Sequence, residues 1–209
     1  MNKKINLCIL SIMLAGSALG FAGIKLTRGG YESPEYTSKK HANGFEVRSY
    51  SSMTIVSTRK EVSQNKNERD SRFMRLFKYI DKSNAKSKKI AMTTPVFMGM
   101  EGKEGEMSFV IPKKVASEGA PAPDSDSLQV KEMKPVTFAA MRFRGKPSKE
   151  SSAAIELIKK VKSAGLEIEK NTKPIFAYYD PPWIPVFLRK NEVLIKIVAP
   201  KKNIKTNKK

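Results

Sequence analysis

The chain has 209 residues, of which 40 are Lys or Arg and 20 are Asp or Glu, so its formal net charge is +20. This length allows one sizeable core or two small domains, and a single Cys and a single His exclude cysteine-rich and histidine-rich metal clusters. The charge favours anionic partners such as nucleic acid, phospholipid head groups or an acidic small molecule, with a solvated basic surface as the alternative.

Residues 1–22 are predicted to be a secretory signal peptide. Two early lysines form its basic start, residues 5–24 carry no charge, and small residues around Ala18 and Ala22 offer cleavage positions. The uncharged run approaches the roughly 20 residues that span a bilayer, so an uncleaved membrane anchor is the alternative. Cleavage would remove Cys8 and leave no thiol for a disulfide, a metal or a nucleophile. The expected location is periplasmic or secreted.

Three further segments follow the signal peptide. Residues 23–43 mix Gly, Pro, Ser and Thr with both charges, which is typical of a linker or an extended lead-in. Residues 44–199 carry the periodic apolar pattern of a folded domain. Residues 200–209 contain five lysines and are predicted to be a basic tail.

The first half of the domain is predicted to hold four strand segments. Phe45–Arg59 alternates partly between apolar and polar residues around a bend at Ser51, which indicates two strands. Ile90–Met98 and Glu106–Pro112 read as two more. Pro95 lacks a backbone N–H, so it must lie at an edge, a bulge or a strand end.

A helix is predicted between these strand pairs, over Phe73–Ile80. The residues expected to face the core are Phe73, Leu76, Phe77 and Ile80. Met74 and Lys78 share a neighbouring stripe at i, i+4, and Arg72 and Arg75 lie on a third. Such a helix can be a core helix with a solvated basic face. It can also line a groove for a flat apolar ligand whose carboxylates pair with the basic residues.

The same order of elements returns after a surface loop over residues 113–127. Leu128–Met133 aligns with the first strand, and Glu192–Val198 aligns with Glu106–Pro112. Val136–Phe138, a helix running from an N-cap at Ser148 to a stop at Gly165, and Ile175–Tyr179 occupy the places between. The fold class expected is α+β, with two similar halves that each contribute one helix to a distorted barrel or a pair of packed sheets.

The loop between the last two predicted strands carries a second candidate surface. Several prolines stiffen it, and it carries the only tryptophan, Trp183, together with Phe187. A rigid apolar loop of this kind can be a packing lid or one wall of a ligand site. Tyr178 and Tyr179 precede it; a tyrosinate can ligate haem iron, although strand tyrosines are more often structural.

Catalytic chemistry finds little support in the sequence. His41 lies in the lead-in, where an exposed loop position is the simplest interpretation, and no glycine-rich phosphate loop or paired general acid and base is present. The protein is therefore not expected to be an enzyme.

Four motifs in order resemble the SOUL haem-binding protein family. They are Phe45–Tyr50, the helix from Phe73 running into Lys89–Val96, Ser108–Pro112, and Tyr178–Pro182 followed by Arg189–Val193. The matched region spans residues 44–198, nearly all of the predicted domain.

This resemblance implies a distorted β-barrel of two pseudo-symmetric halves that binds haem or a related porphyrin without a covalent bond. The ligand would occupy a shallow apolar site beside the first helix, with basic residues near its propionates. The residues carried over by position are Arg72, Met74, Arg75, Lys78, Trp183 and Phe187. An axial histidine has been assigned within part of the family, but His41 lies outside the matched region and does not take that role over.

Two other functions stay open at this point. The chain could be a general carrier or sensor of amphipathic anions, or a basic protein held electrostatically on an anionic membrane surface or on nucleic acid. Binding of a tetrapyrrole by a monomer, with no specific nucleic-acid partner, is the leading expectation. Tyr178, Tyr179 and His41 are the candidates for an iron ligand.

Overall fold

The computed structural model describes residues 30–60, 71–102, 105–145, 147–181 and 183–200. The predicted signal peptide and residues 201–209 of the predicted tail lie outside these ranges. From Glu32 onward the chain forms one unit. Its described helices include none that is long and apolar enough to cross a membrane.

The first half begins with strands that the sequence locates well. The predicted bend at Ser51 separates β2 from β3, because β2 covers Glu46–Tyr50 and β3 covers Met53–Thr58. A further strand, β1 (Tyr36–Lys40), lies inside the segment expected to be a linker or an extended lead-in, and it pairs antiparallel with β2. The remaining elements of this half are α2 (Arg72–Ile80), β4 (Val96–Met98), β5 (Met107–Val110) and the short helix α3 (Lys113–Ser117).

The second half follows the order that runs from β2 to β5 in the first. Its elements are β6 (Leu128–Met133), β7 (Val136–Phe143), α4 (Glu150–Ser163), β8 (Ile175–Tyr178) and β9 (Asn191–Lys196), with short 3-10 turns at Pro147–Lys149 and Val186–Leu188. Ser148 lies in the first of these turns, so α4 starts two residues after the predicted cap. Gly165 has φ +70°, and the amide that follows it, at Leu166, donates to the carbonyl of Val161 at 3.2 Å, which ends the helix as expected.

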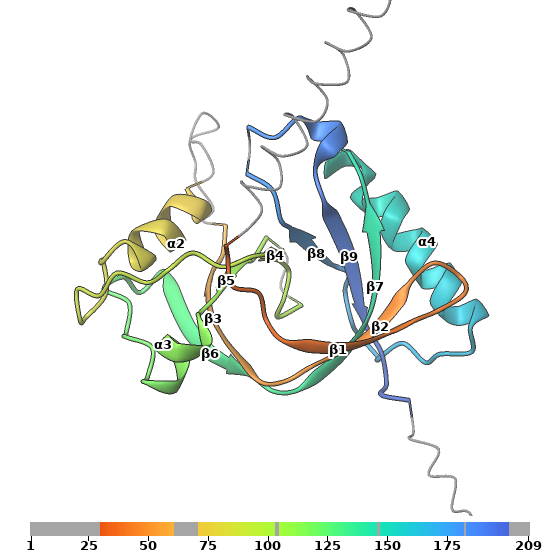
Figure 1. Cartoon of the computed structure of the whole chain (residues 1–209), viewed down its shortest axis with the longest axis horizontal. Coiled ribbons are helices and arrows are strands. Elements are labelled where there is room, and N and C mark those ends of the chain that lie inside the picture. The colour runs from red at the N-terminus through yellow and green to blue at the C-terminus, as the bar shows by residue number, and fades with distance from the viewer. Residues whose placement is uncertain (1–29, 61–70, 103–104, 146, 182, 201–209) are drawn as a thin grey trace, which may run out of the picture. The chain divides into compact units, whose positions relative to one another are not determined.

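All nine strands form one sheet in the order β1-β2-β7-β9-β8-β4-β5-β3-β6. The counterparts in the two halves are β2 and β6, β3 and β7, β4 and β8, and β5 and β9. From β2 to β6, exchanging each strand for its counterpart gives the same order read from the other end. A pseudo-twofold axis therefore passes between β8 and β4. The α+β class is therefore confirmed, while β1 and α3 of the first half have no counterpart among the described elements of the second. The sheet is strongly curved but open, because β1 and β6 are edges, so it approaches a barrel without closing (Figure 1).

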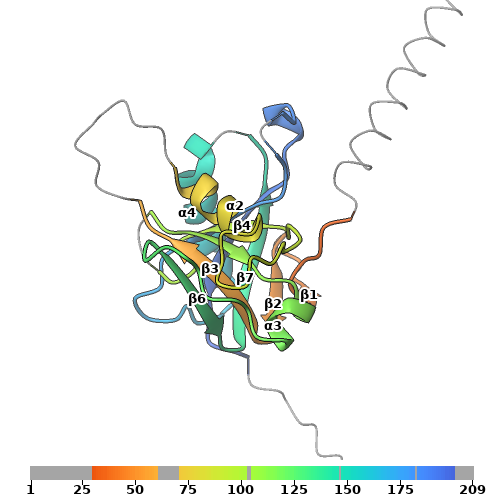
Figure 2. The same cartoon turned by 90° about the vertical axis from the view of Figure 1, so that its left-hand side faces the viewer.

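Each half contributes one helix to the outer face of the sheet, where α4 also covers Val47 of β2 and α2 also covers Leu128 of β6 (Figures 1 and 2). Below α4, Ala139 and Met141 of β7 pack with Leu157 and Val161. Below α2, Val56 of β3 and Phe109 of β5 pack with Leu76 and Tyr79 of the helix.

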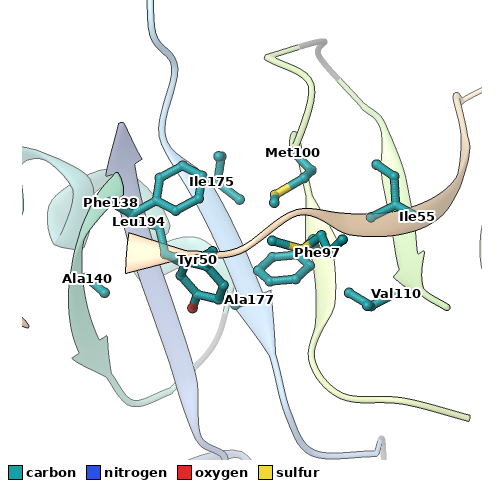
Figure 3. Close-up of a cluster of buried hydrophobic side chains, with 11 residues drawn as sticks. Tyr50, Ile55, Phe97, Met100, Val110, Phe138, Ala140, Ile175, Ala177 and Leu194 are labelled. Carbon is teal, nitrogen blue, oxygen red and sulfur yellow. The ribbon is translucent and has the colours of Figure 1, made fainter. Parts of the chain in front are cut away.

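A third cluster lies on the inner face of the sheet and joins the two halves. Figure 3 shows Tyr50, Phe97 and Phe138 converging there with aliphatic side chains from both halves. Because side chains alternate along a strand, Phe138 and Ala140 of β7 point into this cluster while Ala139 points to α4. The inner face is thus apolar at its centre, and its polar residues lie toward the two ends.

Two local predictions are wrong. Only the last three residues of Ile90–Met98 form a strand; before them, Thr93 makes an isolated bridge to Glu32, its hydroxyl donates to the carbonyl of Val110 at 2.6 Å, and the Thr94–Pro95 peptide bond is cis. On α2, Leu76 and Ile80 are buried as expected, but the third buried residue is Tyr79. Phe73 and Phe77 are exposed instead.

Candidate functional site

The exposed side of α2 is apolar. Phe73, Met74 and Phe77 are 42%, 51% and 40% exposed, although they are three of the larger hydrophobic side chains in the described chain. The rings of Phe73 and Phe77 stack with centroids 6.2 Å apart, and Phe73 also meets the ring of buried Phe109 edge-on at 5.4 Å. These contacts fix a flat aromatic surface that opens to solvent.

The basic residues of α2 divide into two kinds. Arg72 donates from Nη1 to the carbonyl of Gly105 at 2.5 Å, and Arg75 donates from Nε to the hydroxyl of Thr58 at 3.2 Å and from Nη2 to the carbonyl of Arg59 at 2.7 Å. Both arginines therefore tie α2 to the first half of the sheet.

Lys78 differs from the two arginines. Its ammonium group has no ion-pair or hydrogen-bond partner in the described part of the chain, and it is exposed one turn from Met74. It is the cation of this helix that can reach a ligand.

The late loop also exposes its aromatic residues. Trp183 is 73% exposed and Phe187 is 69% exposed. Ile184 between them is buried, and its carbonyl accepts a hydrogen bond from Nε of Arg189 at 2.8 Å, which fastens the loop. This loop joins β8 to β9 in the second half, whereas α2 packs on β3 and β5 in the first. The six residues predicted for the site thus form two separate surfaces.

The candidate iron ligands already have partners. Tyr178 donates its hydroxyl to the carboxylate of Glu150, and Tyr179 donates to Oε2 of Glu192 at 2.7 Å. Burial raises the pKa of Tyr179, and the nearby charge of Glu192 raises it further, so its phenol stays protonated. His41 stacks on Phe45 with ring centroids 4.6 Å apart, in the turn between β1 and β2 and remote in the sheet order from the strands that carry α2.

Within the described ranges no group of three His, Cys, Asp or Glu side chains could hold a metal ion.

The sequence interpretation missed a buried polar network. Glu192 is 1% exposed and Arg48 is 4% exposed, and the two form an ion pair with Nη1 2.6 Å from Oε2. Arg142 and Lys190 approach Oε1 of the same carboxylate at 3.6 and 3.9 Å. A signal was present: Glu192 aligns with Glu106 in the repeated pattern, and Glu106 is also 1% exposed.

Two cavities of about 260 and 270 Å³ open beside these buried glutamates. The first is lined by Ser57, Arg59, Glu106 and neighbouring residues. The second is lined by His41, Arg48, Arg142, Glu192 and neighbouring residues. Neither cavity includes a residue of α2 or of the late loop, so the aromatic surfaces and the cavities are different features.

Comparison with known proteins gives one family. Residues 31–196 match the family model described as SOUL heme-binding protein. Heme-binding protein 1 of Xenopus tropicalis is 31% identical over 179 residues, which cover 79% of this chain and 92% of the relative, and Heme-binding protein 1 of Xenopus laevis is 30% identical over the same shares.

Solved structures share the fold at low identity. A hydrolase from Listeria innocua superposes with a TM-score of 0.52 at 11% identity, covering 75% of this chain and 92% of that one. An uncharacterized conserved protein from Listeria innocua gives a TM-score of 0.53 at 10% identity, covering 75% and 93%. At such identities the likeness concerns the fold alone.

Proposed function

Because this chain belongs to the SOUL heme-binding protein family, we propose that it binds haem or a related tetrapyrrole, without a covalent bond, on the exposed side of α2. The relatives named Heme-binding protein 1 support the class of ligand. The function is binding and not catalysis.

One observation carries the proposal: the aromatic surface of α2 ends in Lys78, a cation that has no partner among the described residues. A porphyrin has two broad apolar faces and an edge with two carboxylates. The stacked rings of Phe73 and Phe77 offer a flat surface for the face, Met74 adds a soft thioether, and Lys78 can pair with a propionate. The residues present therefore fit the group.

The arginines of α2 act differently from the expectation. Arg72 and Arg75 bind backbone carbonyls and a hydroxyl of the protein, so they hold the helix in place and a propionate would have to compete with those bonds. In this proposal Lys78 is the main propionate partner and the two arginines are positioning residues. Haem supplies its own iron chemistry when bound.

Titration of hemin into the full-length protein tests the proposal. The Soret band reports binding, and fluorescence of Trp183, the only tryptophan, reports quenching. The double variant Phe73→Ser, Phe77→Ser should weaken binding by about tenfold or more, because each ring buries apolar surface worth ~1.5 kcal/mol or more. Ile155→Ser is the matched control, since Ile155 is a large hydrophobic residue exposed on α4.

The charge is tested in the same assay. Lys78→Glu should weaken hemin binding by about tenfold, while Lys159→Glu, which reverses an exposed lysine on α4, should not. Equal losses for the α2 variants and the α4 variants would contradict a site on α2. Trp183→Ser with the Soret readout shows whether the late loop takes part.

Three comparison ligands separate tetrapyrrole binding from the competing functions. Metal-free protoporphyrin should bind nearly as well as hemin, because the proposed contacts do not involve iron, whereas a fatty acid should bind more weakly. A carrier of general amphipathic anions would take all three equally. Attachment to an anionic membrane through the basic surface would be lost steeply with added salt, and apolar burial of a porphyrin would not.

Export is part of the proposal. It is supported by the basic start, the uncharged run and the small residues in residues 1–24. N-terminal sequencing of protein recovered from outside the cytoplasm should find a start near residue 19 or 23. A start at Met1 in a membrane fraction would indicate the uncleaved anchor.

A further inference from the structure

The two cavities occupy equivalent positions in the two halves. Ser57 of β3 pairs with Ser108 of β5 and with Gln129 of β6, while Ala140 of β7 pairs with Leu194 of β9 and with Glu46 of β2. The pseudo-twofold axis therefore exchanges these two positions. Ser57 lines the first cavity, and Ala140 lines the second.

Two further positions follow the same symmetry. Glu106 lies two residues before Ser108 on the chain, and Glu192 lies two residues before Leu194. In the same way, Arg59 lies two residues after Ser57, and Arg142 lies two residues after Ala140. Each cavity thus has a buried glutamate and an exposed arginine in matching places. Each cavity can therefore serve as a control for a binding site in the other.

The two cavities differ in charge. The charged residues of the first are Arg59, Lys60, Glu101, Glu106 and Asp126, two cations against three carboxylates. The charged residues of the second are Lys40, Glu46, Arg48, Arg142 and Glu192, three cations against two carboxylates. An anion would therefore be attracted to the second cavity and not to its symmetric counterpart.

Within the second cavity the buried charges satisfy one another. Glu192 accepts hydrogen bonds from Nη1 and Nη2 of Arg48 at 2.6 and 3.2 Å and from Tyr179, and Nε of Arg48 donates to Glu46 at 2.9 Å. Arg48, Glu46 and Glu192 together carry one net negative charge, so the positive net charge of the cavity comes from Arg142 and Lys40.

These two cations are available to a ligand. Arg142 is 65% exposed, and among the described residues it forms an ion pair with Glu192 alone, at 3.6 Å from Nε. Over the described ranges its Nη1 and Nη2 atoms have no protein partner, nor does Nζ of Lys40. A guanidinium whose two terminal nitrogens are free presents the fork that binds the paired oxygens of a carboxylate or a phosphate.

We propose that the cavity lined by the β1–β2 turn, β2, β7 and β9 binds a small oxyanion, held by the guanidinium of Arg142 and the ammonium of Lys40. Its volume of about 270 Å³ lies below the roughly 300–1,000 Å³ of sites for drug-sized ligands. A phosphate group or a small dicarboxylate fits this size. The site is independent of the surface proposed for haem, which lies on α2.

An NMR titration of the full-length protein in a non-ionic detergent tests this site. Inorganic phosphate and succinate are added separately at constant ionic strength, with sodium chloride alone as the reference. Backbone amides of residues 40–46 and 140–142 should shift in a saturable way, and those of residues 57–60 and 127–129, around the first cavity, should not. The stronger of the two anions identifies whether phosphate or carboxylate is the preferred group.

Three variants sharpen the result. Arg142→Gln and Lys40→Gln should each weaken the anion by about tenfold, since each removes one charge-assisted contact. Arg59→Gln, the symmetric change at the first cavity, should leave the affinity unchanged. Arg142 and Lys40 are exposed side chains, so neither variant depends on rebuilding the core.

Several outcomes would overturn the proposal. Shifts that do not saturate, shifts of equal size at both cavities, or an affinity that neither Arg142→Gln nor Lys40→Gln lowers would each do so. Hemin affinity should be the same in Arg142→Gln and in the unmodified protein. A tenfold loss of hemin affinity in that variant would show that a propionate occupies the cavity and that no separate site exists.

Discussion

Arg48 and Glu192, 144 positions apart in the sequence, form a two-point ion pair inside the sheet, with Nη1 2.6 Å from Oε2 and Nη2 3.2 Å from Oε1. Arg48 lies on β2, Glu192 lies on β9, and β7 runs between them. Tyr179 donates to the same carboxylate at 2.7 Å. The first half and the last strand of the second half are therefore joined by a buried polar contact as well as by apolar packing.

Removal of Arg48 should destabilise the protein strongly. Arg48→Met leaves the carboxylate of Glu192 buried without its main partner, which typically costs about 3–5 kcal/mol. Urea unfolding followed by circular dichroism measures this change. Arg142→Met is the control, because Arg142 is 65% exposed and touches the same carboxylate at 3.6 Å, so its loss should cost no more than about 1 kcal/mol.

The double variant Arg48→Met, Glu192→Leu separates the ion pair from its surroundings. Replacement of both charges by apolar groups should recover most of the loss, because the cost of burying two ions disappears together with their attraction. A double variant as unstable as Arg48→Met alone would show that the pair is not the cause.

Stability should fall in acid because of Glu192. Burial alone would raise the pKa of this carboxyl, but the hydrogen bonds and the charge of Arg48 outweigh it and hold the pKa below the ordinary value of 4.5. The unfolded chain then takes up the proton at a higher pH than the folded chain. The stabilisation is complete above about pH 4.5 and is lost as pH falls through the lower pKa of the folded state.

Urea midpoints between pH 7 and pH 3 check this dependence. The unmodified protein should lose stability below about pH 4.5, and Glu192→Gln, which cannot titrate, should show a shallower slope there. Glu156→Gln on the exposed side of α4 serves as the control and should keep the slope of the unmodified protein. Identical slopes for all three proteins would rule out the assignment to Glu192.

Asn84 is expected to hold the turn that follows α2. Its side chain is buried, and its Nδ2 donates to the carbonyls of Tyr79 at 2.9 Å and Lys88 at 2.8 Å, while Oδ1 accepts from the amide of Lys88 at 3.1 Å. Asn84→Ala leaves these backbone groups without partners and should cost about 2 kcal/mol. Asn43→Ala, at an exposed position, should change the unfolding free energy by no more than about 0.5 kcal/mol. Matching losses for both variants would contradict this role.

Most of the fold follows from local patterns in the sequence. The bend at Ser51, the helix stop at Gly165 and the repeated order of strands and helices depend on turn chemistry and apolar periodicity, which act over a few residues. The pairing of β2 with β7 and of β3 with β6 does not follow in the same way, since it depends on contacts between distant strands.

The rotation of α2 shows where periodicity fails. The apolar pattern predicts that the face with Phe73, Leu76, Phe77 and Ile80 is buried, whereas the buried residues are Leu76, Tyr79 and Ile80. The two faces differ by a modest rotation about the helix axis, and the predicted face is the more apolar of the two. The structure buries Tyr79, because its hydroxyl donates to the carbonyl of Pro121 at 2.8 Å and the ring can then enter the core without an unpaired polar atom. Phe73 and Phe77 are left on the surface, where they form the surface proposed for haem.

The sequence repeat aligns the two buried glutamates but does not reveal their partners. Charged residues are rarely buried unless they are paired, and the partners Arg48 and Glu192 are too far apart in the chain for any local pattern to connect them. The repeat aligned Glu106 with Glu192, but only the sheet shows that both side chains point to the inner face and that each borders a cavity.

The exchange of strands between the halves also constrains biosynthesis. Three strands of the first half pair with strands that are synthesised later: β2 with β7, β3 with β6 and β4 with β8. Each of these early strands therefore keeps one unpaired edge until its partner is made, and the last of these partners ends at residue 178. Unpaired edges of this kind are templates for wrong pairing and aggregation. The early strands of a nascent chain are therefore open to such pairing until residue 178 has been made.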